Sequence, residues 1–258
     1  MQKNLAYPAI LLVSILAVVG VLSLDPIAQD LAYHRFIDQR AIFTIPNFWN
    51  IVSNLLFLYV GIAGLHGIFS APGFKMIDEL KGAYTLFFAA VLLVALGSGY
   101  YHLSPDNESL VWDRLPMAIA FMALFSIIIG EFVSVQLGKL VFWPLIILGA
   151  FSIIYWQYTE AKGIGDLRYY ILVQGLPMLL IPLILLLFKS QFTVVSGYWM
   201  LLCAYGLAKV FEFFDAAIYG ATLLLSGHSL KHITAGIGVL FLLNAFKKRE
   251  HQPRVKGS

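Results

Sequence analysis

The sequence predicts an all-α protein, a polytopic bundle of transmembrane helices. Apolar residues make up 60% of the 258 residues and charged residues only 12%, whereas a soluble domain carries about 25% charged residues. Apolar stretches of roughly 20 residues, the length that a helix needs to cross a bilayer, recur along the chain. Segments with the polar and apolar alternation of a transmembrane β-barrel do not occur. This composition excludes an ordinary soluble enzyme and a disordered chain.

Eight stretches are predicted as spans, a seven-span core over residues 48–246 preceded by one extra N-terminal span. The first stretch, 7–24, follows Lys3 as the apolar part of a signal peptide would. No small-x-small cleavage site follows it, so we expect a retained helix. Residues 247–258 would form a basic cytoplasmic tail, and 1–258 a single integral membrane domain. The predicted spans are Tyr7–Leu24, Phe48–Phe69, Gly82–Tyr101, Leu115–Val135, Leu140–Gln157, Arg168–Phe188, Gly197–Tyr219 and His228–Phe246.

The basic residues in the loops predict the orientation, because cytoplasmic loops of membrane proteins carry an excess of Lys and Arg. With eight spans both termini lie on one side, and more basic residues gather on that side than on the other. We therefore predict cytoplasmic termini. A basic tail can also contact nucleic acid, but a positive membrane flank explains it more simply, and no nucleic-acid partner is expected. Most of the excess lies in the tail, at Lys247, Lys248, Arg249, Arg254 and Lys256.

Polar residues at the ends of three predicted spans point to a functional site, since ionisable groups at membrane depth are costly and usually functional. His228 and His232 are four residues apart at the start of the last span, which places them on one helix face. Ser98 and His102 have the same spacing at the end of the third span, and Asp113 is expected to open the fourth. An even number of spans separates His102 from His228. All five side chains should therefore meet on one side of the membrane, the non-cytoplasmic side in the predicted orientation.

Three histidines and an aspartate favour a catalytic zinc site. Three imidazoles leave one position open on a tetrahedral zinc ion, and the single cysteine, Cys203, cannot build a cysteine-rich site. Zinc lowers the pKa of its bound water toward about 7 and polarises a carbonyl group. Asp113 could then take the proton of the water, and Ser98 could donate a hydrogen bond to the developing oxyanion. The residues alone predict a metal-assisted acyl hydrolase and do not separate amides from esters.

Each of these features also has a purely structural interpretation. Two histidines four residues apart can hydrogen-bond at a helix start. Ser98, beside two glycines, can be a small residue at a helix contact. Asp113 can stabilise a helix N-terminus. Their combination at one depth favours the metal site.

The chain resembles the alkaline ceramidase family, which belongs to a superfamily of seven-span membrane hydrolases that includes the adipoQ receptors. The resemblance covers about Asn47 to Phe246. It implies a zinc ion held by His102, His228 and His232. It also implies Asp113 as general base and Ser98 as a group that binds the oxyanion or positions the water. The implied reaction is cleavage of the N-acyl bond of ceramide or a related acyl lipid, giving a fatty acid and an amine or sphingoid base. The motifs that carry the resemblance are Ser98-Gly-Tyr-Tyr-His102, Trp112-Asp113-Arg114-Leu115-Pro116-Met117, His228-Ser-Leu-Lys-His232 and Phe48-Trp49-Asn50-Ile-Val-Ser53-Asn54.

Two departures from the eukaryotic members of that family look like its bacterial branch. The stretch 40–47 lacks their acidic calcium-binding cluster, and Asn47 stands where they have Glu, so calcium is not expected. An extra span precedes the seven-span core. We therefore expect a bacterial-type enzyme of the inner membrane. The oligomeric state is not predicted.

The roles of several further polar residues, and the choice between a hydrolase and other kinds of membrane protein, are not decided by the sequence. Asp215 could hold one metal-bound imidazole, as such carboxylates often do, or could be an ordinary buried hydrogen-bonding group. Asn50, Ser53 and Asn54 could contact a polar substrate group or pack helices. A receptor-like relative or a hydrolase of another acyl lipid, such as an esterase, is the main alternative. A transporter is less favoured, because no internal repeat is visible.

Overall fold

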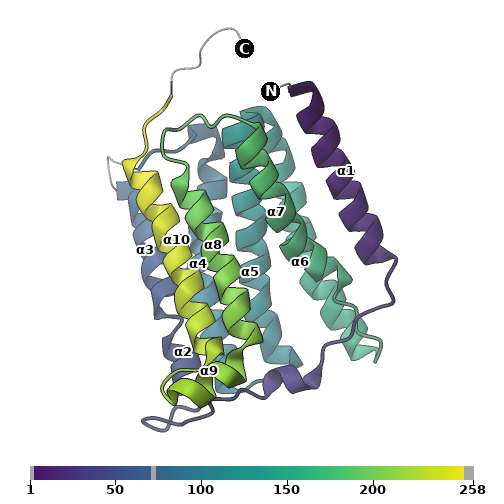
Figure 1. Ribbon diagram of the computed structural model, residues 1–258, viewed down its shortest axis with the longest axis vertical. Coiled ribbons are helices and arrows are strands. Elements are labelled where there is room, and N and C mark those ends of the chain that lie inside the picture. The colour runs from purple at the N-terminus through teal and green to yellow at the C-terminus, as the bar shows by residue number, and fades with distance from the viewer. Residues whose placement is uncertain (1–2, 71–73, 253–258) are drawn as a thin grey trace.

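The chain folds into a helical bundle in the computed structural model, which describes residues 3–70 and 74–252 (Figure 1). The predicted all-α class is confirmed, since this part of the chain holds no β-strand beyond two isolated bridges. The start of α1 and the end of α10 lie at one end of the bundle, and α2 and α9 lie at the other. The helices are α1 Lys3–Leu22, α2 Phe48–Val52, α3 Leu55–Ser70, α4 Lys81–Leu103, α5 Asn107–Ile128, α6 Val135–Ala161, α7 Arg168–Leu187, α8 Ser196–Phe213, α9 Asp215–Thr222 and α10 Gly227–Lys248, with 3₁₀ turns Leu31–His34 and Asp78–Leu80 and a π-helical turn Ile129–Val133.

The chain is a multi-pass membrane protein, but the predicted count of eight spans is not confirmed. The predicted span 197–219 is divided at Phe214 into α8 and α9, and Lys209 and Glu212 lower the mean hydropathy of α8. α8 nevertheless packs closely along α10 (Figure 1). Seven segments among the described residues are long and apolar enough to cross a membrane, namely Leu5–Leu22, Phe48–Ser70, Asp78–Leu103, Asn107–Val133, Val135–Ala161, Arg168–Leu187 and Gly227–Lys248.

The extra N-terminal helix lies at the edge of the bundle, whereas α5 lies at its centre. Only 6% of the most apolar 18-residue stretch of α1 is buried, compared with 67% of the corresponding stretch of α5. α1 packs mainly on α7 and leaves large side chains such as Leu11, Leu16 and Val19 exposed. A continuous exposed apolar surface of this kind fits contact with lipid.

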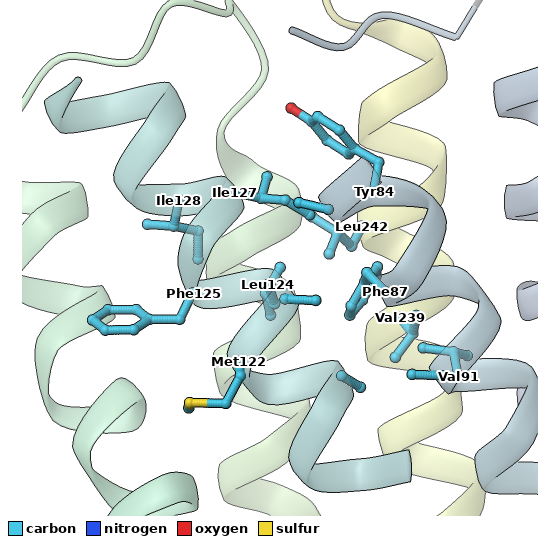
Figure 2. Packing of buried hydrophobic residues seen from close by; sticks show 14 of the residues in the cluster. Tyr84, Phe87, Val91, Met122, Leu124, Phe125, Ile127, Ile128, Val239 and Leu242 are labelled. Carbon is cyan, nitrogen blue, oxygen red and sulfur yellow. The ribbon is translucent and has the colours of Figure 1, made fainter. Parts of the chain in front are cut away.

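The core is formed where α4, α5 and α10 meet. Figure 2 shows Phe87 and Val91 of α4 directed at Leu124 of α5 and at Val239 and Leu242 of α10. These apolar contacts hold together the three helices that carry the site residues. The ends of the same helices, which contain those residues, are therefore fixed relative to one another.

Two predicted boundaries differ from the structure. α5 begins at Asn107, so Asp113 lies in its second turn and does not open the helix. The helix starts early because Asp106 accepts a hydrogen bond from the Ser109 amide, 2.6 Å long, while the Ser109 hydroxyl accepts one from the Asp106 amide at 3.1 Å. The predicted span 48–69 is also interrupted, at residues 53–54, between α2 and α3.

A buried ion pair closes the end of the bundle where α10 ends. Arg249, predicted as part of a free basic tail, is only 1% exposed and pairs with Glu131 at 2.8 Å. The hydroxyls of Tyr84 and Tyr198 donate hydrogen bonds to the same carboxylate. The Arg249 guanidinium also lies 3.7 Å from the Phe192 ring centroid. Two other predicted tail residues, Arg254 and Lys256, lie outside the described residues.

Candidate metal centre

His102, His228 and His232 come together from α4 and α10, as the spacing and span parity predicted. One nitrogen from each ring lies within 4.8 Å of the nitrogens of the other two. The ring centroids are 4.9 to 5.1 Å apart, and all three residues are buried. Three neutral imidazole nitrogens at such separations can hold one metal ion.

Several nitrogens of the three histidines are buried without a hydrogen-bond partner in the described residues. Among the described residues, both ring nitrogens of His102 and Nε2 of His228 are buried and make no hydrogen bond within the protein. Burying a polar atom without a partner is unfavourable. Coordination to a metal would satisfy these atoms, so the residues present fit a metal ion.

The first turn of α10 positions His228 and His232. The Ser226 hydroxyl caps the helix by accepting a hydrogen bond from the Ser229 amide at 3.1 Å. The carboxylate of Asp215 accepts a hydrogen bond of 2.8 Å from the backbone amide of His228. Asp215 therefore contacts the backbone of a candidate ligand and not its imidazole ring. Gly227 lies so close to the Phe211 carbonyl that a Cβ atom would overlap it.

Asn50 and its neighbours surround the second nitrogen of His232. Nδ1 lies 3.2 Å from the Asn50 carbonyl oxygen, 2.9 Å from the Ser53 hydroxyl and 3.2 Å from the Asn54 side-chain nitrogen. Ser53 and Asn54 each donate a hydrogen bond to the same Asn50 carbonyl. The break between α2 and α3 exposes these groups to His232. Ser53, three residues after Asn50, was expected with Asn50 and Asn54 to contact a polar substrate group or to pack helices, and its contact with His232 was not predicted.

Two residues that the sequence analysis missed hold His102. The ring of Phe36 lies 4.6 Å from the His102 ring and 4.8 Å from the His228 ring, centroid to centroid. The Asn47 side chain donates a 2.9 Å hydrogen bond to the His102 carbonyl oxygen. Phe36 lies in a loop without helical periodicity, so no sequence pattern could place it here.

Ser98 and Asp113 line the same cavity as His232. This cavity has a volume of about 330 Å³. Both residues are buried, and the Ser98 hydroxyl makes no hydrogen bond within the described protein. Most of the wall is apolar and includes Phe57, Phe87, Val91, Val94, Phe121, Leu124 and Val239. The cavity thus has two parts. Its polar pole lies beside His232 and is lined by Ser98, Asp113, Arg114, Lys209, Glu212 and Lys231, and its apolar pole is lined by the apolar residues named above.

A salt bridge fixes the loop that covers the site. The Arg40 guanidinium lies 2.7 Å from the Asp38 carboxylate, and its hydrogen bonds keep the pKa of Asp38 below the usual value. Arg40 also donates to the carbonyl of Leu224, in the connection before α10. The Asp38 carbonyl accepts a hydrogen bond from the Asn50 side chain. This loop thereby joins α2 to the start of α10, on either side of His232.

Residues 40–255, well over half of the chain, match the family model described as Ceramidase. No curated protein matches. The matched range contains all three histidines, Ser98 and Asp113.

Proposed function

The chain belongs to the ceramidase family, which implies a membrane amide hydrolase with a ceramide substrate, and we propose that it is a zinc-dependent intramembrane amidohydrolase. The reaction is hydrolysis of the N-acyl bond of ceramide or a related acyl lipid to a fatty acid and an amine or sphingoid base. The observation that carries the proposal is the cluster of three histidines. Among the described residues, its buried nitrogens on His102 and His228 have no hydrogen-bond partner, and its third member, His232, lines a cavity with Ser98 and Asp113.

His102, His228 and His232 would hold the zinc ion, since three nitrogen ligands with one open position are typical of catalytic zinc. When bound there, zinc supplies a water of lowered pKa and polarises the acyl carbonyl. The Asn50 carbonyl supports this assignment for His232. In the tautomer with the proton on Nδ1, this nitrogen donates a hydrogen bond to the Asn50 carbonyl at 3.2 Å, and Nε2 is the ligand atom. Asp215 holds His228 in place through the backbone.

Asp113 is the proposed general base. Its carboxylate takes a proton from the attacking water and then delivers it to the nitrogen of the leaving amine. The Ser98 hydroxyl has no other partner within the described protein and donates a hydrogen bond to the oxygen that becomes negatively charged. The apolar pole of the cavity receives the acyl chain.

We further propose the membrane arrangement predicted from the sequence. α8 with α9 acts as the eighth span, because α8 packs along α10 and its Glu212 pairs with Lys209 and with Lys231 of α10. The termini are cytoplasmic and the histidines face the non-cytoplasmic side of a bacterial inner membrane. Residues 48–246 form the hydrolase core of a single membrane domain.

The test is metal analysis of the purified protein combined with a ceramide hydrolysis assay before and after chelation. About one zinc per chain and chelator-sensitive release of fatty acid are expected. Zinc without release from ceramide would point to another acyl lipid or to a receptor-like protein. A folded preparation that binds no metal would contradict the proposal.

A further inference from the structure

The polar pole of the cavity carries more positive charge than its proposed chemistry needs. Arg114, Lys209 and Lys231 line it together with only two carboxylates, Asp113 and Glu212. Glu212 pairs with both lysines, at 2.7 Å to Lys209 and 2.5 Å to Lys231. With the histidines neutral, one cationic side chain remains in excess.

Among these three cations, Arg114 uses only part of its hydrogen-bonding capacity within the described residues. It is 7% exposed, and in the described part of the chain its Nη1 has no hydrogen-bond partner. Nη2 donates to the neutral side chain of Gln29 at 2.6 Å, and no described carboxylate forms an ion pair with Arg114. A buried charge without a counter-ion is strongly unfavourable. This arrangement indicates that a negative partner is supplied from outside the chain.

Aromatic rings hold the Arg114 guanidinium in place, and one of them also contacts Lys231. The guanidinium carbon lies 4.8 Å from the Trp156 ring centroid and 5.0 Å from that of Tyr170. The Tyr33 ring contacts both cations, with its centroid 5.5 Å from the Arg114 guanidinium carbon and 5.9 Å from the Lys231 nitrogen. A guanidinium fixed in this way suits hydrogen bonding to an oxyanion.

We propose that the site accepts N-acyl lipids whose amine part carries an oxyanion (phosphate, sulfonate or carboxylate) near the amide bond. Arg114 Nη1 binds one oxygen of that group, and Lys231 contributes the second positive charge. The chain of the lipid occupies the apolar pole. This inference rests on the proposed function and adds a preference for anionic over neutral lipids.

The experiment compares ceramide with ceramide 1-phosphate of the same acyl chain, for the wild-type protein and Arg114→Gln. We expect the wild type to favour ceramide 1-phosphate in kcat/KM. Arg114→Gln should lower the ratio of the two kcat/KM values at least about tenfold, since it removes a charge-assisted hydrogen bond. Arg114→Lys keeps the charge and should restore part of the ratio. Arg168→Gln removes a similar charge outside the cavity and should leave the ratio unchanged.

The outcomes separate this inference from the proposed function. An equal effect of Arg114→Gln on both lipids would mean that Arg114 is structural, and would overturn the inference while ceramide hydrolysis stands. If neither lipid is hydrolysed, the proposed function fails. Stabilisation by ceramide 1-phosphate in thermal unfolding then decides the inference, because it should be lost in Arg114→Gln. Inhibition of ceramide hydrolysis by inorganic phosphate in the wild type alone would mean that a free anion suffices.

Discussion

Gly97 of α4 lies against the carbonyl oxygen of Trp112 on α5, so closely that a Cβ atom at residue 97 would overlap it. Pro116 has no N–H with which to bond that carbonyl, so the oxygen lacks its usual helical partner. Ser98 and Asp113 are the next residues of the two helices. This contact therefore sets the distance between the two proposed catalytic groups.

Gly97→Ala should disrupt this distance. The added methyl group forces α4 and α5 apart, and overpacking of this kind costs about 1–3 kcal/mol of stability. Small displacements at a reacting centre can lower a rate on the order of a hundredfold. We expect ceramide turnover to fall by at least about tenfold, measured alongside the thermal unfolding of the same preparation.

Gly99→Ala is the matched control. A Cβ atom at residue 99 would meet only the Ile51 side chain, at 4.0 Å, which is an ordinary contact. The change should be tolerated and should stabilise the helix by about 0.5–1 kcal/mol. If both alanine variants lose activity equally, the close approach at Gly97 is not what positions the site.

Asp113→Asn and His228→Ala should separate the roles of base and ligand. Asparagine cannot accept the proton of the water, so turnover should be abolished while bound zinc is retained. Alanine at residue 228 removes one nitrogen ligand, so both metal and turnover should be lost. Metal content and fatty-acid release, measured on the same two preparations, test the distinction. Equal loss of metal in both variants would contradict it.

Ser53→Ala should weaken metal binding without removing a ligand. The Ser53 hydroxyl lies 2.9 Å from His232 Nδ1 and donates to the Asn50 carbonyl, so it helps to fix the ring. Loss of such a supporting partner typically costs about 10- to 100-fold in metal affinity. Competition with a chelator measures this change.

Ser152→Ala provides the comparison for that variant. Ser152 is likewise buried, and among the described residues its hydroxyl bonds to a carbonyl of its own helix, that of Gly149 on α6. Its replacement should leave zinc affinity at the wild-type value. A similar loss in both serine variants would indicate a general loosening of the bundle.

Arg249→Gln should destabilise the protein without altering the metal centre. Breaking a buried ion pair leaves the other charge uncompensated and costs about 3–5 kcal/mol, here at Glu131. The pair lies at the end of the bundle away from the histidines, so zinc content should stay the same. Lys248→Gln removes an adjacent exposed charge and should change stability by no more than about 0.5 kcal/mol. An equal loss of stability in these two variants would contradict the importance of the pair.

The features best predicted from the sequence are those that depend on the spacing of residues along a helix and on the number of membrane spans between two residues. The four-residue spacing places His228 and His232 on one helix face, and the even number of spans between them and His102 places His102 on the same side. The structure confirms that the three histidines meet. Composition alone was enough for the helical class and the membrane. These properties follow from the helical period and the bilayer, which act on short segments independently of the rest of the fold.

Contacts that depend on tertiary packing could not be predicted. Phe36 contacts the histidines from an irregular loop. Arg249 was predicted as part of the basic tail, but it is buried because it pairs with the buried Glu131. The Asn50 carbonyl and the Ser53 hydroxyl are available to His232 Nδ1 because the helix breaks at residues 53–54. None of these features has a periodic signature, because each is created by residues distant in sequence.

The peripheral position of α1 has a consequence for how such a chain can change over evolutionary time. A helix that contacts little besides α7 can be gained or lost without repacking the core. A membrane-crossing helix added at this edge would move the amino terminus to the opposite side of the membrane, while the chain from α2 onward would keep its direction. The side that holds the N-terminus would then be set independently of the side on which the histidines lie.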